Sequence, residues 1–591
     1  MRSGTYSVLA AEGGISLGSV NLVLDGLYPW QEATFSTDGS TINVTIVTVG
    51  DLEPGLYIGP NNGDLSDGAN WSDGKVPTSG NVTFACIAPV TLTNGATFAP
   101  TSITFAEGCS PVTITGDFTT LTCVTNNSFV NQTFAGFVDF GERDIDVTQT
   151  GIYTYTCTTN NNNITEHPVG VSGGCVVFAG GVRGADFVNH KVLTGHYELT
   201  KTGNFESTAE KDGRIVINEN SSLSVKNAGN TCTLYIREGA TFNVENVSLT
   251  PGDSGIEARN CLWCWSKGTY VVSGLTHSSA INNRDSCLGG HTFSYAYGST
   301  YNAGSVLKIG TLTLDSDKIL ALHGTGLNSG GSTPTIFIGE GGVNIASGKA
   351  GYYRVRSRIH KTTLRPWNSD FTFGRGSHAY YDFLLGEGAN DGNLENINFT
   401  LNTDDEAGVP RTITMAARIK TTKDTSTITV AGSGTNVVTS ASPLMTGTYA
   451  VTDSATVKFM EGAGFANGTV SVGPAATLAI GESVTVNPGN LTLADGATLA
   501  FNWTERAAAP VLDLAGRTVA VNGTVKVMVS ADALVDKPDG GTFVVTSGGS
   551  FKNKTVELAE GSPYWAQNVY VNGDGDIVLD VGLSGVIIRL K

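Results

Sequence analysis

Three segments of equal length near the C-terminal end of the chain follow one another with a constant 21-residue period. They are Gly447–Phe459, Gly468–Ile480 and Gly489–Phe501. A fixed period in the twenties is typical of a solenoid, in which each repeat forms one coil. In each segment, apolar residues occupy positions 3, 5, 11 and 13, and a turn triplet separates the two pairs. Because residues two apart share one face of a strand, each segment predicts two strands that face a common core.

The same pattern recurs upstream at irregular spacing, in Gly213–Val225, Cys232–Val244 and Gly310–Leu322. Irregular spacing is expected where loops of different length leave the coils. One such unit cannot bury its apolar residues alone, so the coils must stack on one another. The sequence therefore predicts an all-β chain folded as a parallel β-helix, or β-solenoid. We expect a right-handed coil and, from the chain length, roughly 20 to 25 coils with irregular loops in the middle region.

Composition supports this fold class and restricts the partners. The chain has 75 glycines and only 15% charged residues, which suits a protein of short strands and tight turns. A net charge of −18 argues against nucleic acid or anionic lipid, because both bind basic surfaces. No apolar run is long enough to span a bilayer, and no apolar signal region follows Met1. We therefore predict no membrane insertion by this segment.

The two ends of the chain share a pattern. Residues 4–46 and 541–581 both begin with Gly-Thr-aromatic, contain one Trp, and close with Asp-Gly and an alternating apolar run. The chain thus opens with a segment of the closing type, as expected for a piece of a longer repetitive protein or for a gene whose start is misplaced, with an export signal lost in the missing part. The expected regions are 1–50, the closing segment of a preceding repeat unit; 51–80, a turn-rich linker; 81–440, an irregular β-helix with all the cysteines; 441–530, regular coils; and 531–591, a closing β segment.

The linker contains Asn70-Trp71 followed by Gly74 and Pro77, and later coils have the form GxLxLxxGATLxF. These motifs resemble bacterial secreted β-helix proteins with autotransporter-type strand repeats. The resemblance covers residues 57–582 loosely and 447–581 best. It implies a secreted or surface-displayed protein of the adhesin or stalk type, and hence an extracellular or cell-surface location.

All nine cysteines lie between residues 86 and 287. Three pairs are separated by about one coil: Cys86 and Cys109, Cys157 and Cys175, and Cys264 and Cys287. Equivalent positions on adjacent coils lie about 4.8 Å apart, within the Cα separation that a disulfide accepts. Two interpretations stay open: disulfides between coils in an oxidising compartment, or free thiols packed in the core. Because Cys261 and Cys264 have no second Cys pair, we predict no metal or other cofactor.

A cationic and aromatic segment stands out against the acidic background. Arg354, Arg356 and Arg358 alternate along one predicted strand. Arg side chains bind carboxylate or sulfate, and aromatic rings cover the apolar faces of sugars, so this segment predicts a glycan or host-surface ligand. The alternative is an ordinary half-buried strand with an outward Arg face and aromatic residues in the core. The predicted ligand-binding residues are Tyr352, Arg354, Arg356, Arg358, Arg365, Trp367 and Tyr380.

No motif assigns a catalytic residue. The acids and acid–base pairs considered are Asp315, Asp317, Asp404, Asp405, Glu406, Arg183 with Asp186, and Arg284 with Asp285. A glycosidase needs two carboxylates held roughly 5 to 10 Å apart, and these acids occur in turn-like strings instead. Two function classes follow. The favoured class is a non-enzymatic surface rod that presents binding sites. The alternative is a β-helical carbohydrate-active enzyme, either a polysaccharide lyase or a tailspike-like glycoside hydrolase.

Overall fold

The computed structural model describes residues 4–16, 18, 22–24, 27, 30–160, 163–188, 192–200, 214–228, 233–236, 240–249, 269–277, 286–288, 306–315, 317, 319–322, 335–355, 362–386, 397–532 and 538–582. These residues form strands and connecting turns, apart from one 3-10 turn at Gly68–Asn70. The chain divides into two compact units, Met1–Asn243 and Val244–Lys591. Consecutive coils in each unit are joined by parallel strand pairs, so the fold is the parallel β-solenoid that the sequence predicts. The handedness of the coil stays a prediction.

The first unit begins with a small antiparallel sheet of three strands in the order β1-β3-β2. These strands are β1 (Gly4–Ala10), β2 (Gln31–Thr37) and β3 (Thr41–Thr48). Alternate residues of β3 are buried, namely Ile42, Val44 and Ile46. We call this sheet, with the segment that joins its strands, the N-terminal sheet.

The solenoid of the first unit is built from short strands of two to ten residues. They are β4 (Asn81–Phe84), β5 (Val90–Thr93), β6 (Ser102–Phe105), β7 (Val112–Thr115), β8 (Cys123–Asn126), β9 (Gln132–Phe134), β10 (Val138–Asp139), β11 (Ile145–Gln149), β12 (Ile152–Asn160), β13 (Asn163–Ser172), β14 (Val176–Gly184), β15 (Phe187–Val188), β16 (Val192–Leu199), β17 (Arg214–Ile217), β18 (Ser222–Ala228) and β19 (Thr233–Ile236). Strand β20 (Thr241–Leu249) spans the boundary between the units. The parallel ladder β4-β6-β8 follows the 21-residue period, so that Val82, Ile103 and Val124 stand in one row.

Aromatic side chains fill the first coils of this unit. Trp71 stacks on Phe98 at 5.1 Å between ring centroids and packs edge-on against Tyr57 at 5.6 Å. The Trp71 indole donates to the carbonyl of Leu65 at 2.8 Å, and Asn70 donates to the carbonyl of Asp64 at 2.7 Å. The Asn-Trp motif of the linker therefore holds its own turn together and places a large ring against the first coil.

The second unit is also a parallel solenoid. Its strands are β21 (Thr269–His277), β22 (Ser286–Leu288), β23 (Val306–Leu314), β24 (Ile319–Leu322), β25 (Thr335–Ile345), β26 (Tyr352–Val355), β27 (Thr362–Pro366), β28 (Phe371–Phe373), β29 (Phe383–Leu385), β30 (Asn398–Asn402), β31 (Thr412–Met415), β32 (Ile419–Thr421), β33 (Thr427–Ala431), β34 (Thr435–Val438), β35 (Thr448–Val451), β36 (Thr456–Phe459), β37 (Thr469–Val472), β38 (Thr477–Ile480), β39 (Thr485–Val486), β40 (Asn490–Leu493), β41 (Thr498–Trp503), β42 (Val511–Asp513), β43 (Val519–Val521), β44 (Thr524–Ala531), β45 (Gly541–Val544), β46 (Thr546–Ser547), β47 (Thr555–Leu558), β48 (Ala566–Val571) and β49 (Ile577–Val581).

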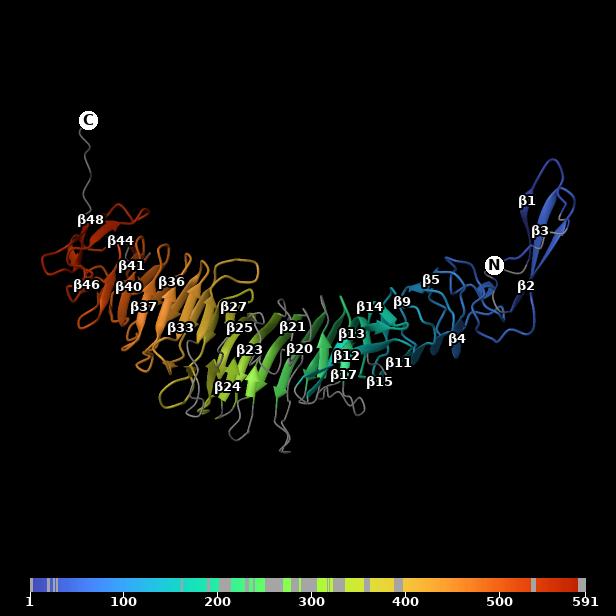
Figure 1. Cartoon of the computed structure of the whole chain (residues 1–591), viewed down its shortest axis with the longest axis horizontal. Coiled ribbons are helices and arrows are strands. Elements are labelled where there is room, and N and C mark those ends of the chain that lie inside the picture. The colour runs from blue at the N-terminus through green and yellow to red at the C-terminus, as the bar shows by residue number, and fades with distance from the viewer. Residues whose placement is uncertain are drawn as a thin grey trace. The chain divides into compact units, whose positions relative to one another are not determined.

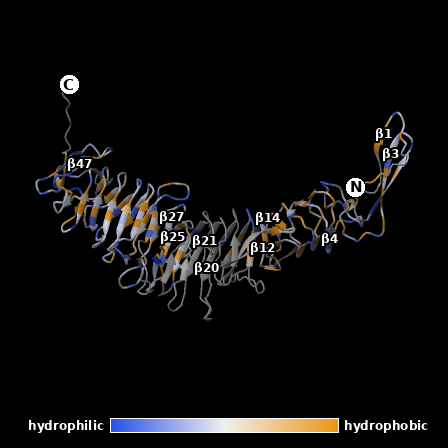
Figure 2. Ribbon diagram, in the orientation of Figure 1, coloured by the Kyte–Doolittle hydropathy of each residue, from blue (hydrophilic) through white to orange (hydrophobic). Residues whose placement is uncertain are grey.

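The 21-residue period is one coil of this solenoid. Strand β35 pairs in parallel with β37, and β37 with β40, so that Tyr449, Val470 and Leu491 stand in one row. The second strands of the three segments, β36, β38 and β41, pair in the same register. Every second residue of these strands is buried, as predicted. Figure 1 shows these strands stacked in chain order, and Figure 2 shows apolar and polar residues alternating along them.

A further coil of the same period precedes the three that the sequence pattern identifies. Strands β33 and β34 pair with β35 and β36 in the same register, so Ile428 aligns with Tyr449 and Asn436 with Val457. Asn436 points inward and is fully buried. Its amide donates to the carbonyl of Ile413 at 2.9 Å, and the Tyr449 hydroxyl donates to its Oδ1 at 2.6 Å. A polar residue at an inward position explains why the apolar pattern missed this coil.

Replacing Tyr449 with phenylalanine should lower the free energy of unfolding of these coils by about 1–3 kcal/mol. The change leaves the buried Oδ1 of Asn436 without its hydroxyl donor, and the burial that raises the pKa of Tyr449 also excludes water from the site. Hydrogen exchange of the β33–β36 amides measures the effect. The double variant Tyr449→Phe/Asn436→Val should exchange more slowly than Tyr449→Phe alone. Equal exchange in the single variant and the parent would contradict the assignment.

The C-terminal end of the second unit is covered by an antiparallel sheet with the strand order β45-β49-β48. We call residues 541–582 the C-terminal cap. Its short strand β46 pairs in parallel with β42 of the solenoid, and Leu512 donates its amide to the carbonyl of Val545 at 2.9 Å. The ring of Trp503, at the end of β41, lies 6.0 Å from Phe543 and 6.1 Å from Trp565. The cap thus covers the last coil with both backbone and aromatic contacts.

Candidate functional site

Three strands on adjacent coils form the base of the candidate site. Strands β26, β29 and β32 are neighbours in the parallel sheet β22-β24-β26-β29-β32. Tyr353 aligns with Phe383, and Phe383 aligns with Ile419, so their apolar side chains form one buried row. The residues immediately before this row are Tyr352, Asp382 and Arg418. The coil register therefore brings these three residues together although they lie far apart in the sequence.

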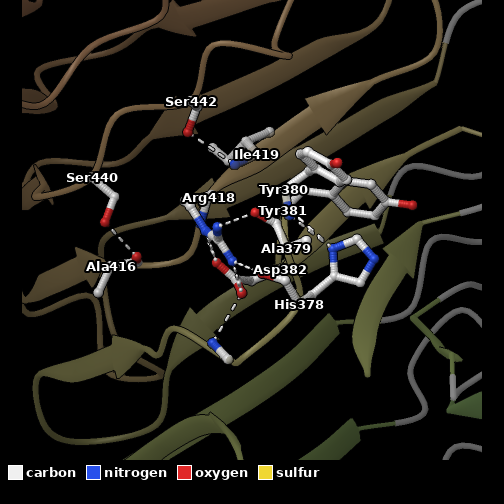
Figure 3. A network of polar contacts seen from close by, with 11 residues as sticks. His378, Ala379, Tyr380, Tyr381, Asp382, Ala416, Arg418, Ile419, Ser440 and Ser442 are labelled. Carbon is white, nitrogen blue, oxygen red and sulfur yellow. Dashed lines mark hydrogen bonds and ion pairs between the residues drawn. The ribbon is translucent and has the colours of Figure 1, made fainter. Parts of the chain in front are cut away.

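A buried ion pair fixes the loop that leads into β29. Arg418 donates from Nε to Oδ2 of Asp382 at 2.9 Å and from Nη2 to Oδ1 at 3.0 Å, and the Asp382 side chain is fully buried. Asp382 also accepts the backbone amides of Gly376 and Arg418. Arg418 in turn donates to the carbonyls of His378 and Ala379. The bonds to Asp382 raise the pKa of Arg418, and the whole network ties the loop 374–382 to the coil below (Figure 3).

Aromatic rings gather on one side of this pair, as Figure 3 shows for His378, Tyr380 and Tyr381. The Tyr381 ring lies 4.3 Å from His378 and 4.9 Å from Tyr352 between centroids. Lys420 places its Nζ 4.9 Å from the centre of the Tyr381 ring, and Tyr380 is 68% exposed. We call Tyr352, His378, Tyr380, Tyr381 and Lys420 the Tyr–His surface.

His378 is neutral near pH 7. Burial, together with the nearby charges of Arg418 and Lys420, lowers its pKa below the ordinary value of 6.5, although Asp382 opposes this. Its Nδ1 accepts the backbone amides of Tyr380 and Tyr381 at 3.3 and 3.2 Å, so the ring proton resides on Nε2. Protonation would place a third positive charge beside Arg418 and Lys420.

The residues predicted as one binding site fall on two different sheets. Tyr352 and Tyr380 belong to the Tyr–His surface, whereas Arg365 and Trp367 come from β27 and the residue after it, in the long sheet. Arg365 donates to the carbonyls of Asp404 and Asp405 at 3.1 and 2.6 Å and lies over the Phe337 ring. Arg365 therefore holds a turn of the next coil.

The predicted outward face of Arg354 is wrong. Arg354 is only 5% exposed, because β26 and its neighbour β29 are buried on both faces. Arg356 and Arg358 lie outside the described residues. His378, Tyr381 and Lys420 were missed by sequence reasoning. The string Tyr380-Tyr381 beside His378 was visible, but Lys420 joins it only through the coil register, which irregular loops conceal.

The acids considered for catalysis are engaged in structural contacts. Asp405 is buried and bonds to Arg411 at 2.8 Å, and Asp404 accepts from the backbone and hydroxyl of Ser433. Glu406 pairs with Lys308 at 2.7 Å. Asp315 pairs with Lys349, and Asp317 accepts the amide of Ala350. Each of these acids stabilises a turn or neutralises a cation.

Neither of the two acid–base pairs named from the sequence is found as a pair among the described residues. Arg183 pairs with Asp139 at 2.6 Å, whereas Asp186 accepts the amide of its neighbour Phe187. Arg284 and Asp285 lie outside the described residues. Within the part of the chain that the structure describes, no group of three His, Cys, Asp or Glu residues is arranged to hold a metal ion.

One predicted cysteine pair is brought together, with both residues as reduced thiols in the structure. Cys86 and Cys109 are buried on adjacent coils, and the Cys86 carbonyl accepts the amide of Ser110 at 2.6 Å. A hydrogen bond with the Cys86 thiol lowers the pKa of Cys109. Cys175 packs against Gly151 at the base of the β12–β13 hairpin, whereas Cys157 lies along β12 opposite Glu166. Five residues of strand separate Cys157 from Ile152, about 16 Å, so the structure does not bring Cys157 and Cys175 together.

Cys264 lies outside the described residues, and nothing is described of the Cys287 side chain. The prediction of a disulfide between these two residues is therefore not tested.

Folding under oxidising conditions should join Cys86 and Cys109 and stabilise the surrounding coils by about 3 kcal/mol, because the bond closes a loop and so restricts the unfolded chain. Peptide mass spectrometry after digestion identifies the bond, and thermal unfolding with and without reductant measures its effect. Cys86→Ser should abolish the difference, while Cys175→Ser should preserve it. Full alkylation of both thiols after unfolding the oxidised protein would contradict the prediction.

The fold and the site define the class of this protein: an all-β parallel solenoid with a clamped aromatic and cationic loop on its side. Comparison of the chain with models of protein families, with curated proteins and with solved structures finds no match. Among the described residues, no helix has the length and apolar character needed to cross a membrane.

Proposed function

We propose that this chain is a secreted or surface-displayed β-solenoid that binds anionic glycans through the Tyr–His surface. The observation that carries the proposal is the contact of Lys420 with the Tyr381 ring beside an exposed Tyr380, on a loop clamped by a buried ion pair. The extracellular location rests on the resemblance to secreted β-helix proteins and on the adjacent Cys86 and Cys109.

The chemistry of the Tyr–His surface suits an acidic sugar. Tyrosine rings cover the apolar faces of sugar rings while their hydroxyls reach the polar edge. Lys420 offers a positive charge to a carboxylate or sulfate, and the Nε2–H of His378 offers a neutral donor. Because the Asp382–Arg418 pair already holds the loop, binding would lose little conformational entropy.

The contacts favour this proposal over the enzyme alternative. The acids that a hydrolase or lyase would draw on are engaged with cations or backbone amides, as described for Asp404, Asp405 and Glu406. A binding surface needs rings and cations, and the loop 374–382 with Lys420 supplies both.

The test is retention of the protein in gels containing sulfated, uronic or neutral polysaccharide at low salt. Tyr380→Ala and Lys420→Ser should each weaken binding to a charged polymer about five- to tenfold. Tyr564→Ala and Lys526→Ser make the same chemical changes at exposed positions elsewhere and should leave binding unchanged. Retention that all four variants keep equally, or no retention of the parent, would refute the proposal. Shortening of any polymer would support the enzyme instead.

Acidification should strengthen binding to a sulfated polymer, which stays charged, by about three- to tenfold between pH 7 and pH 5. An anion favours the protonated form of His378, whose pKa is lowered in the free protein, so proton and polymer binding reinforce each other. His378→Asn should remove the increase and keep the binding at pH 7. The free energy of unfolding should fall on acidification. The pKa of His378 is lower in the folded chain than in the unfolded chain, so protonation below about pH 6.5 favours unfolding.

A further inference from the structure

The N-terminal sheet and the C-terminal cap are copies of one structure. Both have three antiparallel strands with the third strand in the middle, in the orders β1-β3-β2 and β45-β49-β48. Gly4 aligns with Ile46 at the start of the first pair, as Gly541 aligns with Val581 in the second. The sequence similarity of the two ends therefore extends to strand order and to the register of the first strand pair, whereas the register of the second pair differs by two residues: Gln31 aligns with Thr48, and Ala566 with Val581.

Details of the two sheets agree as well. A tryptophan immediately precedes the second strand of each sheet, Trp30 in one and Trp565 in the other. Its carbonyl accepts the amide of the residue that follows the third strand, at 2.9 Å for Val49 and 2.8 Å for Gly582. In both sheets, a glycine in the left-handed region forms the turn before the third strand, with φ of 93° at Gly39 and 91° at Gly575.

The two copies differ in what covers their first strand. In the C-terminal cap, Phe543 contacts Trp503, Val545 accepts the Leu512 amide, and Thr546 pairs with β42, so the segment adds a strand to the last coil. Val545 and Thr546 are fully buried there. Counted from the glycine that opens each sheet, the corresponding residues of β1 are Tyr6, Val8 and Leu9, which are 37%, 53% and 55% exposed. A bulge between Ser7 and Leu9 shifts the pairing of β1 with β3 by one residue at this point. Figure 2 shows apolar residues on this strand.

We propose that the N-terminal sheet is a solenoid cap whose exposed strand β1 binds the C-terminal coil of another β-solenoid segment. The partner is defined by the coil that the equivalent surface covers in this chain. This coil has a strand edge like that of β42, whose amides can donate to the carbonyls of residues 8–10. It also has a buried aromatic residue, equivalent to Trp503, that the Tyr6 ring can contact. This inference concerns a surface separate from the Tyr–His surface and goes beyond the proposed function.

The interaction joins solenoid segments end to end. A cap of this type satisfies the backbone groups of a terminal strand and buries the apolar interior that stacking leaves open. In the sequence that follows the N-terminal sheet, Tyr57 and Trp71 pack against the first coil of this chain. The N-terminal sheet is thus equipped to connect one solenoid segment to the next.

A cap exchange tests the inference within the full chain. In the graft variant, a second copy of residues 4–49 replaces residues 541–582. In a matched variant, the graft carries serine at the positions of Tyr6, Val8 and Leu9. In a third variant, a flexible Gly/Ser segment of equal length replaces residues 541–582. Hydrogen exchange of the β42 and β44 amides reports whether the last coil is covered.

We expect the graft to protect these amides within about threefold of the parent, and the serine graft and flexible variant to exchange at least about tenfold faster. A graft that exchanges as fast as the flexible variant would overturn the inference. A smaller change guards against a graft that fails to fold.

The smaller change is Phe543→Tyr, which gives the natural cap the β1 residue at the position that contacts Trp503. Thr546 is left unchanged, because its buried Oγ1 accepts the Ile577 amide within the cap. The Phe543→Tyr variant too should keep protection of the β42 and β44 amides within about threefold of the parent. Loss of protection in this variant would also overturn the inference.

Discussion

Replacement of Asp382 with alanine should lower the free energy of unfolding of the coils around β29 and β32 by about 3–5 kcal/mol. The side chain is fully buried and accepts four bonds, two from the Arg418 side chain and two from backbone amides. Its removal leaves a nearly buried guanidinium without a counter-charge and releases the loop 374–382. Because coil stabilities in a solenoid are local, hydrogen exchange of the β29 and β32 amides measures the change better than global unfolding does.

Asp370 provides the control for this variant. Its carboxylate is exposed and accepts one backbone amide, that of Thr412 at 2.8 Å. Asp370→Ala should therefore cost less than about 1 kcal/mol. If the two variants had equal effects, the Asp382–Arg418 pair would not be the element that holds the loop. Asp382→Ala should also abolish glycan retention, because the Tyr–His surface loses its support.

The second large effect is expected at the end of the solenoid. Trp503→Ala should destabilise the contact between the last coil and the C-terminal cap by about 3–5 kcal/mol. The Trp503 ring is fully buried between Phe543 and Trp565, so truncation opens a cavity at the interface. The amides of β45, β48 and β49 should then exchange roughly 100-fold faster or more, while those of β35 to β38 should change little.

Two further variants separate packing from hydrogen bonding and from nonspecific damage. Among the described residues, the Trp503 indole nitrogen has no hydrogen-bond partner, so Trp503→Phe loses ring volume alone and should cost less than half as much as alanine. Trp367→Ala removes a half-buried tryptophan from an earlier coil and should leave the cap unaffected. Unchanged exchange in the cap of Trp503→Ala would show that backbone pairing with β42 holds it instead.

The regular coils were predictable because their side chains repeat in register with the backbone. Tyr449, Val470 and Leu491 recur with one period in the sequence and are adjacent in the sheet, so the same period determines both arrangements. The coil of β33 and β34 escaped prediction because Asn436 occupies an inward position. Its amide is satisfied by Ile413 and Tyr449, partners that only the stacking of three coils provides.

The candidate site was predictable only in part. Tyr352 and Tyr380 were named from the sequence, and the structure places both in the Tyr–His surface. Arg354 was assigned to an outward face by alternation, yet β26 is covered on both sides. Alternation predicts which residues share a face, but it does not reveal what covers the outer face of an inner strand.

The sequence by itself determined the fold class, the coil length and the similarity of the two ends, because each of these depends on local periodicity and turn chemistry. Only the tertiary structure decided which coils neighbour one another through the irregular region. That register brings Arg418 to Asp382 and Lys420 to Tyr381, although each pair is separated by much more than one regular coil of sequence. These sequence separations depend on the lengths of the loops inserted between coils. Because the loops differ in length, no local sequence pattern predicts which residues of adjacent coils become neighbours.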